Sequence, residues 1–365
     1  MISGVSNVVL DIHTLTKKEN FSTSVAKLYF KFLSKIGLCD YSLKCLDVDC
    51  KKFCRDIAVL SEKIIPDLIH VQHPLDAYYI SHSKWRNVPV VQTVHSFWLY
   101  EIIDKKLSKA HLKKINDIQY FAYSYVSRFI SLNELQYKQL IESGVAKEKI
   151  TIIPNAIDKF KVNNAAALAP FTFEGQYLSI VCRLSPEKGV DVALRALALI
   201  AEGSRPMLII VGDGPEKQNL KKLAIQLGLS RFVRFLGGLA HDKALGVIKG
   251  SILSLCPSIN YNGIQDAGPL SVLESIALGV PVAASRIGGL PEYIQHGKNG
   301  YLFSEGDAQS LSEIISGHLL CVDSGAVAEM KFFMDEYSST NSNQSWISKN
   351  ICLYKKIIGN TERDI

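Results

Sequence analysis

The residues best suited to chemistry surround the start of one predicted helix. Pro269 suits the first helical position because its fixed φ and missing N–H cost nothing there, and Gly279 suits the residue just past the end. The pattern therefore predicts a helix over about 269–278. Its first backbone amides, those of Leu270 and Ser271, point outward with the positive end of the helix dipole, so they suit an anion such as a diphosphate.

Two carboxylates flank this anion site. Asp266 stands in the loop just ahead of the amide donors, and Glu274 stands eight residues later, a little over one turn into the helix. Like charges repel, so a carboxylate beside a phosphate is useful only if it accepts hydrogen bonds from hydroxyls. Sugars are the ligands that meet this condition. Taken alone, the segment is explained equally well by an ordinary capped core helix with incidental acids.

A second segment carries two cations on one strand-to-helix loop. The run Ile180–Val190 follows an apolar strand and opens the next helix, and it contains Arg183 and Lys188. Both side chains can face the same anion from the side opposite the helix start. The anion site predicted at the start of the helix in 265–282 would thus have two cations on its opposite side.

Together these segments resemble the large GT-B-fold family of retaining, nucleotide-sugar-dependent glycosyltransferases commonly called family 4. The family's E-x7-E pattern appears as Asp266-x7-Glu274, and its R-L-x-x-E-K-G pattern as Arg183 to Gly189. The first acid is Asp where the family usually has Glu, and Cys182 stands where Gly is common. The resemblance covers nearly the whole chain and is strong from about residue 177 to 303.

The resemblance implies roles for individual residues. Asp266 would bind hydroxyls of the donor sugar, and Glu274 would bind those of the ribose. His95, at the family's T-x-H position, would lie beside the donor sugar and the acceptor. Residues expected at the nucleotide and its diphosphate are Gly4, Arg183, Lys188, Leu236, Leu270 and Ser271, in addition to Glu274. Residues expected to act in catalysis are Asp266, His95, Arg183 and Lys188.

The resemblance also implies the chemistry. The family's reaction is thought to proceed by same-face attack within an ion-pair-like transition state, with the leaving phosphate as base, so Asp266 is not expected to be a nucleophile. Arg183 and Lys188 would neutralise the leaving diphosphate without a metal. Asp47 and Asp49 form a D-x-D pair of the kind that binds metal in other transferases, but we expect no metal there. No cofactor is expected, since the UDP- or GDP-linked sugar is a substrate.

The length of 365 residues suffices for two α/β domains, each with its own core. The net charge of +6 is uneven, because residues 1–161 carry 23 Lys and Arg against 16 Asp and Glu. The basic stretch 105–114 reads as a helix face that meets anionic lipid headgroups or a phosphorylated acceptor, or as an ordinary solvated face. Nucleic acid is a poor alternative, since no recognised binding module accompanies the charge.

Cysteine usage and hydropathy favour a cytoplasmic protein. The eight cysteines are too scattered for a disulfide scaffold and lack zinc-site spacing. No apolar run approaches the length of a membrane span, and no signal-peptide pattern opens the chain. We therefore expect any membrane contact to be peripheral, on the inner face.

The start of the sequence leads to alternative predictions. Val5, Val8 and Ile12 recur at helical spacing directly after Gly4, whereas the family has an apolar strand before this glycine loop. Because the first strand of a doubly wound sheet is central, we expect either an upstream true start or a nucleotide-binding remnant without activity. A dinucleotide oxidoreductase is disfavoured, because no complete G-x-G-x-x-G follows the first strand of either half; Gly212 and Gly214 make only a G-x-G.

Strands and helices alternate in both halves, which predicts two Rossmann-like domains facing a cleft. The predicted domains are residues 1–161 for the acceptor and 173–335 for the nucleotide sugar, with a linker near 159–172 and a C-terminal segment 336–365. Its helix, about Ser345 to Ile358, is expected to cross back to the first domain. The strands predicted are 41–46, 66–71, 88–95 and about 129–131 in the first half, and 177–182, 207–211, 233–236, 252–256 and 281–284 in the second. Ser131 is expected to cap the helix that follows it.

Overall fold

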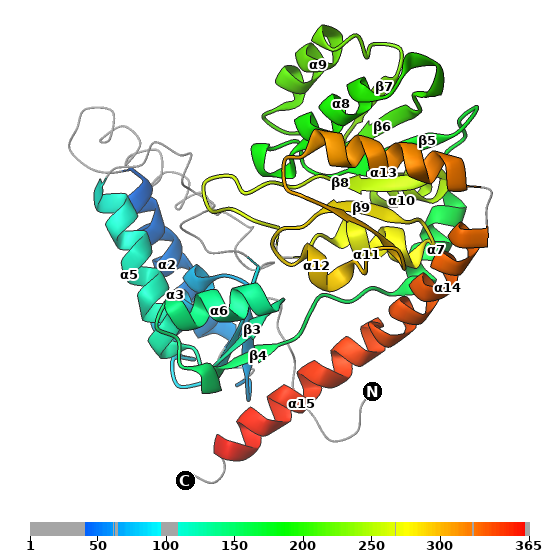
Figure 1. Ribbon diagram of the computed structural model, residues 1–365. Coiled ribbons are helices and arrows are strands. Elements are labelled where there is room, and N and C mark those ends of the chain that lie inside the picture. The colour runs from blue at the N-terminus through cyan, green and yellow to red at the C-terminus, as the bar shows by residue number, and fades with distance from the viewer. Residues whose placement is uncertain are drawn as a thin grey trace. The chain divides into compact units, whose positions relative to one another are not determined.

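The computed structural model describes residues 41–60, 62, 65–95, 109–266, 268–322 and 325–361 (Figure 1). Two compact units make up the chain: unit 1 is Met1–Ile153 with Lys349–Ile365, and unit 2 is Pro154–Ser348. Each unit contains a sheet of parallel strands with helices, so the predicted α/β class is confirmed. Gly4 lies outside the described residues, and so does the whole segment 1–40 that bears on the prediction of a missing first strand.

Unit 1 contains a parallel sheet in the order β1-β2-β3-β4. Its strands are β1 (Ile69–Val71), β2 (Val90–Val94), β3 (Arg128–Ser131) and β4 (Ile150–Ile152), and its helices are α2 (Tyr41–Leu60), α3 (Pro74–Ser81), α5 (Lys109–Tyr125) and α6 (Glu134–Glu142). Ile69 aligns with Val90 in the register of β1 and β2. A core of buried side chains from α2, α3 and α5 packs with side chains of the strands.

The strand predicted at 41–46 is wrong, because these residues begin helix α2. Leu43, Leu46, Cys50, Phe53 and Ile57 recur at alternating spacings of three and four, which is the helical period. Phe53 and Ile57 are buried in the core of unit 1. This longer period outweighs the local strand propensity of the first six residues.

Two helix starts in unit 1 use polar caps. His73 caps α3, since its Nδ1 accepts a hydrogen bond from the Leu75 amide at 3.1 Å, so this histidine has a structural role. The cap of α6 is Asn133, whose Oδ1 accepts from the Gln136 amide at 2.7 Å. The predicted cap Ser131 is therefore wrong by two residues; its buried hydroxyl donates to the carbonyl of Asn133.

Unit 2 contains a six-stranded parallel sheet in the order β10-β9-β8-β5-β6-β7. Helices α8, α9 and α13 pack on one face of this sheet, and α7, α10 and α11 pack on the other. The five strands predicted for this half are confirmed to within a residue at each end. The strands are β5 (Tyr177–Val181), β6 (Met207–Val211), β7 (Val233–Gly237), β8 (Leu253–Cys256), β9 (Val282–Ser285) and β10 (Gly300–Phe303). The helices are α7 (Lys159–Leu168), α8 (Val190–Leu199), α9 (Lys217–Gln226), α10 (His241–Gly250), α11 (Leu270–Ala277), α12 (Leu290–Tyr293), α13 (Ala308–Cys321) and α14 (Gly325–Thr340).

The linker predicted near 159–172 is largely wrong, because α7 occupies most of it. Asp158 caps this helix by accepting from the Lys161 amide at 3.0 Å. Val162 and Ala166, one turn apart, are buried with α10 and α11 side chains. The apolar pair at helical spacing anchors a segment whose Asn and Ala content had suggested a linker.

The last helix, α15 (Asn343–Thr361), confirms the predicted C-terminal helix. It begins in unit 2, and its residues from Lys349 onward belong to unit 1. Within unit 1 the hydroxyl of Tyr354 lies 2.6 Å from Nδ1 of His70, on strand β1. Within the described ranges, no helix combines the length and the apolar character needed to cross a bilayer.

Candidate active site

The strand order of unit 2 reverses at β5, which has β6 on one side and β8 on the other. In parallel α/β sheets, ligands bind outside the carboxyl ends of the strands at such a switch point. Lys188 lies in the loop after β5, at the end of a short 3-10 turn (Pro186–Lys188), and Asp266 lies in the loop after β8. The topology therefore brings two of the predicted site residues to one place.

Lys188 and Asp266 form an ion pair, in which Nζ of Lys188 donates to Oδ1 of Asp266. The hydroxyl of Ser258 donates to the other carboxylate oxygen. The two charged side chains are only 20% and 11% exposed. Burial alone lowers the pKa of Lys188, but the charge and hydrogen bond of Asp266 outweigh it, so the pKa of Lys188 is raised. The site thus holds a fully charged, mostly buried pair.

The backbone of Asp266 is held by a glycine turn after β9. The Gly289 amide donates to the Asp266 carbonyl at 2.9 Å. Gly288 has φ +58°, and a Cβ there would lie 2.1 Å from that same carbonyl oxygen. Only a glycine permits this approach, so the glycine turn fixes the position of the site carboxylate.

Glycines also shape the loop of Lys188. Gly189 has φ +58°, and a Cβ there would lie 2.0 Å from the carbonyl oxygen of Pro257, in the loop after β8. A Cβ on Gly214 would lie 2.3 Å from the carbonyl oxygen of Leu184. The Gly212–Gly214 turn therefore supports the Lys188 loop by close backbone packing, which explains the G-x-G pattern without a dinucleotide.

Glu274 lies on α11 and makes a contact that the sequence did not predict. Nε2 of His241, the first residue of α10, lies 2.7 Å from Oε1 of Glu274. The Glu274 side chain is 11% exposed and that of His241 is 68% exposed. The imidazole thus covers one oxygen of a nearly buried carboxylate, from the solvent side.

The helix start at α11 is confirmed to within one residue, with Pro269 just ahead of the first helical residue, Leu270. The amides of Leu270 and Ser271 donate no hydrogen bond to any residue that the structure describes. Asn155 donates from Nδ2 to the carbonyl of Gly268 at 3.1 Å and so holds the preceding loop. The two amides are therefore available to an anion.

Two other predicted residues make fewer contacts. The Arg183 side chain is exposed and forms no ion pair or hydrogen bond within the described ranges, although it shares a loop with Lys188. Leu236 lies near the end of β7 and packs against the buried cluster that includes Val211 and Ala244. No hydrogen bond or ion pair joins Arg183 or Leu236 to the Lys188–Asp266 pair in the described part of the chain.

In unit 1, His95 directly follows β2, as predicted, and is exposed. Its Nε2 lies 2.8 Å from Oε1 of Gln72. The neighbouring His70 lies between Thr93 and Tyr354, at 2.8 and 2.6 Å. Burial, aided by the charge of His95, lowers the pKa of His70 to about 4, so this second imidazole is neutral at neutral pH.

The D-x-D pair belongs to unit 1, and two buried thiols lie near the ion pair in unit 2. Asp47 and Asp49 lie on α2, and their side chains are outside the described residues. Among the residues described, no cluster of three His, Cys, Asp or Glu could hold a metal ion. Cys182 and Cys256 are free thiols, and burial raises the pKa of each to about 12, so both are protonated at neutral pH.

Comparison with known proteins gives two family models in succession. Residues 49–159 match "Glycosyltransferase Family 4", and residues 172–321 match "Glycosyl transferases group 1". The chain is 27% identical over 326 residues to the D-inositol 3-phosphate glycosyltransferase of Corynebacterium jeikeium, covering 83% of this chain and 73% of that protein. It is 28% identical over 188 residues to the amylovoran biosynthesis glycosyltransferase AmsK of Erwinia amylovora, covering 51% and 46%.

Solved structures share the fold. The crystal structure of Anabaena Alr3699/HepE in complex with UDP-glucose superposes with a TM-score of 0.62 at 21% identity, over 86% of this chain and 82% of that one. By sequence, the chain spans about half the length of the first curated relatives that it matches, which include AmsK.

Proposed function

We propose, since the chain belongs to the family 4 glycosyltransferases of the GT-B fold, that it transfers a sugar from a nucleotide-diphosphate sugar to a glycan or lipid-linked acceptor. The anomeric configuration would be retained, and the product would be a surface polysaccharide or a glycolipid. AmsK, a relative by sequence, acts in amylovoran biosynthesis according to its name. A polysaccharide or glycolipid product is consistent with that likeness.

The observation that carries the proposal is the convergence of Lys188 and Asp266 at the switch point of the unit 2 sheet, with Glu274 on the adjacent helix. A cation is needed there to neutralise the leaving diphosphate, and carboxylates are needed to accept hydrogen bonds from sugar hydroxyls. A structural ion pair would not require unused helix amides beside it. The amides of Leu270 and Ser271 supply the missing donors for a phosphate.

We assign the roles as follows. Lys188, the Leu270 and Ser271 amides and the exposed Arg183 hold the diphosphate, whose charge grows as the glycosidic bond breaks. Glu274 accepts from the ribose hydroxyls, and Asp266 accepts from a hydroxyl of the donor sugar. His95 in unit 1 orients the sugar and the acceptor. The leaving phosphate takes the proton of the acceptor hydroxyl, so no side chain of unit 2 acts as general base and no metal is needed.

The acceptor side of the proposal concerns unit 1. The basic stretch 105–114 is described from Lys109 onward, where Lys113 is exposed and Lys114 donates to the Tyr78 hydroxyl at 3.3 Å. Exposed lysines on α5 favour an anionic acceptor or headgroup. We propose peripheral contact with an anionic membrane surface through this helix.

Thermal stability with UDP, GDP, ADP and CMP, each with and without a chelator, tests the donor site. A ligand that binds only the folded state raises the midpoint, by an amount set by its concentration relative to Kd. We expect one nucleoside diphosphate, UDP or GDP, to raise the midpoint with chelator present, and Lys188→Ala to abolish the shift. A shift that needs metal, or one that survives in Lys188→Ala, would overturn the assigned diphosphate site.

A further inference from the structure

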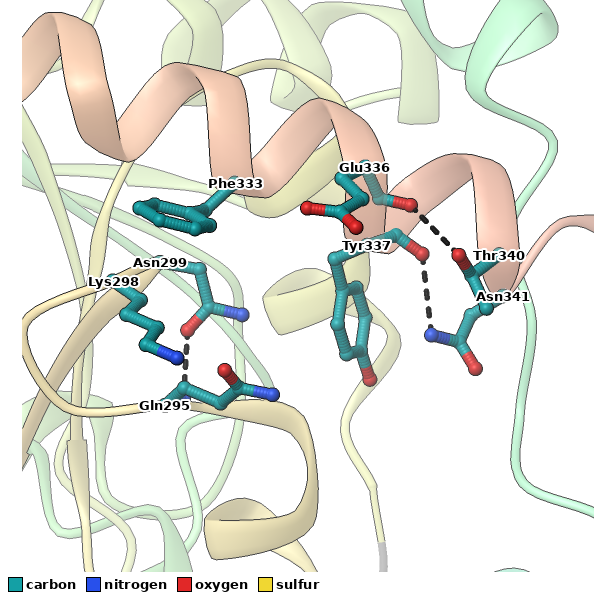
Figure 2. Close-up of a pocket in the computed structure, with 8 residues that line it drawn as sticks. All are labelled: Gln295, Lys298, Asn299, Phe333, Glu336, Tyr337, Thr340 and Asn341. Atoms are coloured by element: carbon teal, nitrogen blue, oxygen red, sulfur yellow. Dashed lines mark hydrogen bonds between the residues drawn. The ribbon is translucent and has the colours of Figure 1, made fainter.

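A second pocket lies in unit 2, between α14 and the segment that joins α12 to β10 (Figure 2). Its volume is about 350 Å³, which is within the range of small-molecule sites. Gln295 and Lys298 line it from the segment, and Phe333, Glu336 and Tyr337 line it from α14. None of these residues belongs to the donor site described above.

Three polar groups of different kinds face this pocket. The side-chain carboxamide of Gln295, the ammonium of Lys298 and the carboxylate of Glu336 have no hydrogen-bond partner within the described part of the chain. Lys298 and Glu336 carry opposite charges but form no ion pair there. The pocket thus offers unused donors and acceptors with no net charge.

Two aromatic rings add an apolar surface. Phe333 and Tyr337 are four residues apart on α14, so their side chains lie on the same side of the helix. Nζ of Lys298 lies 5.6 Å from the centre of the Phe333 ring. Figure 2 shows the Phe333 ring facing the Lys298 side of the pocket and Tyr337 the Gln295 side. Apolar ring faces therefore stand next to hydrogen-bonding groups.

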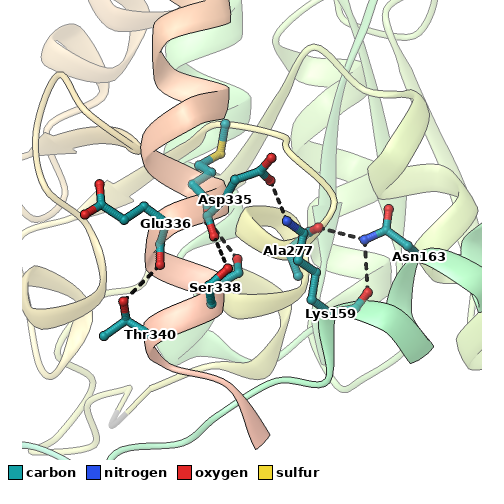
Figure 3. A network of polar contacts seen from close by, with 9 residues as sticks. Lys159, Asn163, Ala277, Asp335, Glu336, Ser338 and Thr340 are labelled. Atoms are coloured by element: carbon teal, nitrogen blue, oxygen red, sulfur yellow. Dashed lines mark hydrogen bonds and ion pairs between the residues drawn. The ribbon is translucent and has the colours of Figure 1, made fainter. Parts of the chain in front are cut away.

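Hydrogen bonds and packing hold both walls of the pocket. Asn299 is buried; its Nδ2 donates to the Tyr293 carbonyl at 2.9 Å and its Oδ1 accepts from the Gln295 amide at 2.8 Å. On the other wall, Met334 is fully buried and Asp335 pairs with Lys159 of α7 at 2.7 Å (Figure 3). A site held from behind in this way needs little reorganisation to bind a ligand.

We propose that this pocket, whose lining residues are not those of the donor site, binds one sugar residue of an uncharged glycan. A sugar ring has hydroxyls that both donate and accept, and it has a C–H face that packs on aromatic rings. Glu336 disfavours an anion such as a nucleotide, and a small zwitterion would make no use of the rings. The biological purpose, holding part of a long acceptor or product, rests on the proposed function.

Binding of neutral trisaccharides to the full chain without nucleotide tests the proposal. The probes are maltotriose, mannotriose and tri-N-acetylchitotriose, measured by saturation-transfer NMR and calorimetry. We expect at least one to bind with a Kd near 1 mM, which is typical of weak saccharide sites worth about 4 kcal/mol. Phe333→Ala is expected to weaken it about tenfold, as loss of a buried aromatic contact does.

Matched variants separate this pocket from other surfaces. Phe332→Ala removes the neighbouring ring, which is 68% exposed and does not line the pocket, so it should leave binding unchanged. Glu336→Gln and Gln295→Ala change exposed groups and should weaken binding while the protein stays folded. Binding that survives unchanged in Phe333→Ala, Glu336→Gln and Gln295→Ala overturns the proposal. The absence of binding to the wild-type protein at about 10 mM saccharide overturns it too. Displacement of the saccharide by glycine or inorganic phosphate also overturns it.

The same samples keep the two proposals distinct. Lys188→Ala should lose the nucleotide-dependent rise in thermal midpoint and keep trisaccharide binding, since Lys188 does not line this pocket. Failure of the nucleotide assay with intact saccharide binding would refute the donor site alone. Nucleotide binding with no saccharide binding would refute the pocket alone.

Discussion

Replacing Lys188 by Met should destabilise unit 2 and stop sugar transfer, for two separable reasons. The partner carboxylate of Asp266 is 11% exposed, so without the ammonium it would keep its charge largely out of water. Removing one member of a fully buried pair costs about 3–5 kcal/mol. The remaining hydrogen bond from Ser258 offsets part of this, and we expect a loss of about 2–3 kcal/mol in the free energy of unfolding.

The double variant Lys188→Met/Asp266→Asn separates stability from function. It leaves no uncompensated charge, so its free energy of unfolding should exceed the value expected from adding the two single effects by at least about 1 kcal/mol. Turnover should stay about 100-fold or more below wild type in every variant that lacks Lys188, because the diphosphate loses its cation.

Urea denaturation and release of nucleoside diphosphate measure these two quantities. The matched control is Lys217→Met, which breaks the exposed Lys217–Asp213 pair of the same unit, with side chains 26% and 61% exposed. Because solvent screens this pair, we expect the control to change stability little and to leave turnover unchanged. If the losses in free energy of unfolding of the two single variants add up to that of the double variant, the ion pair does not form in solution. Near-normal turnover of Lys188→Met would refute its role at the phosphate.

Three further outcomes follow from the same structure. Glu274→Gln should raise KM for the donor and lower turnover about 100-fold with little loss of stability, and unchanged kinetics would remove it from the ribose site. Gly189→Ala should lower both stability and turnover, because the φ of +58° disfavours a side chain and a Cβ would lie 2.0 Å from the carbonyl oxygen of Pro257. Gly175→Ala is the control, since its Cβ would meet nothing within 4 Å. It should cost only the strain of its positive φ, about 1 kcal/mol. His70 has a lowered pKa of about 4, so between about pH 6.5 and 4 the unfolded chain binds more protons and stability falls on acidification by up to about 1.4 kcal/mol per pH unit. Denaturation midpoints of wild type and His70→Gln across that range should show this slope only in wild type; equal slopes would contradict it.

The architecture of unit 2 could be predicted from the sequence because most of its strands are short, largely buried apolar runs. Such runs alternating with helical patterns are typical of parallel sheets. Once the strand order is known, the loops after β5 and β8 must meet, and that places Lys188 beside Asp266. Proline and glycine set both ends of α11 in the same local way.

The contacts that complete the site have no local signal. His241 meets Glu274 across 33 positions, and Ser258 reaches Asp266 from a loop with no recognisable motif. Neither residue type nor spacing marks them, since both contacts depend on how α10 and the loop after β8 pack. The wrong linker at α7 has the opposite cause: Val162 and Ala166 carried a helical signal that the surrounding polar composition obscured.

The ion pair also explains how a shorter first acid can serve a donor site. The carbonyl of Asp266 is bonded to the Gly289 amide and approached by Gly288, so the backbone cannot move inward to replace the missing methylene. Both carboxylate oxygens are engaged, one by Lys188 and one by Ser258. Each carboxylate oxygen can still accept a second hydrogen bond, so a sugar hydroxyl could share Asp266 with Lys188, while a bound diphosphate would compete with Asp266 for the Lys188 ammonium. Binding of the phosphate and of the sugar would then be coupled through one ammonium group, so a nucleoside diphosphate without sugar leaves the Asp266 carboxylate uncompensated and is held less tightly than the intact donor.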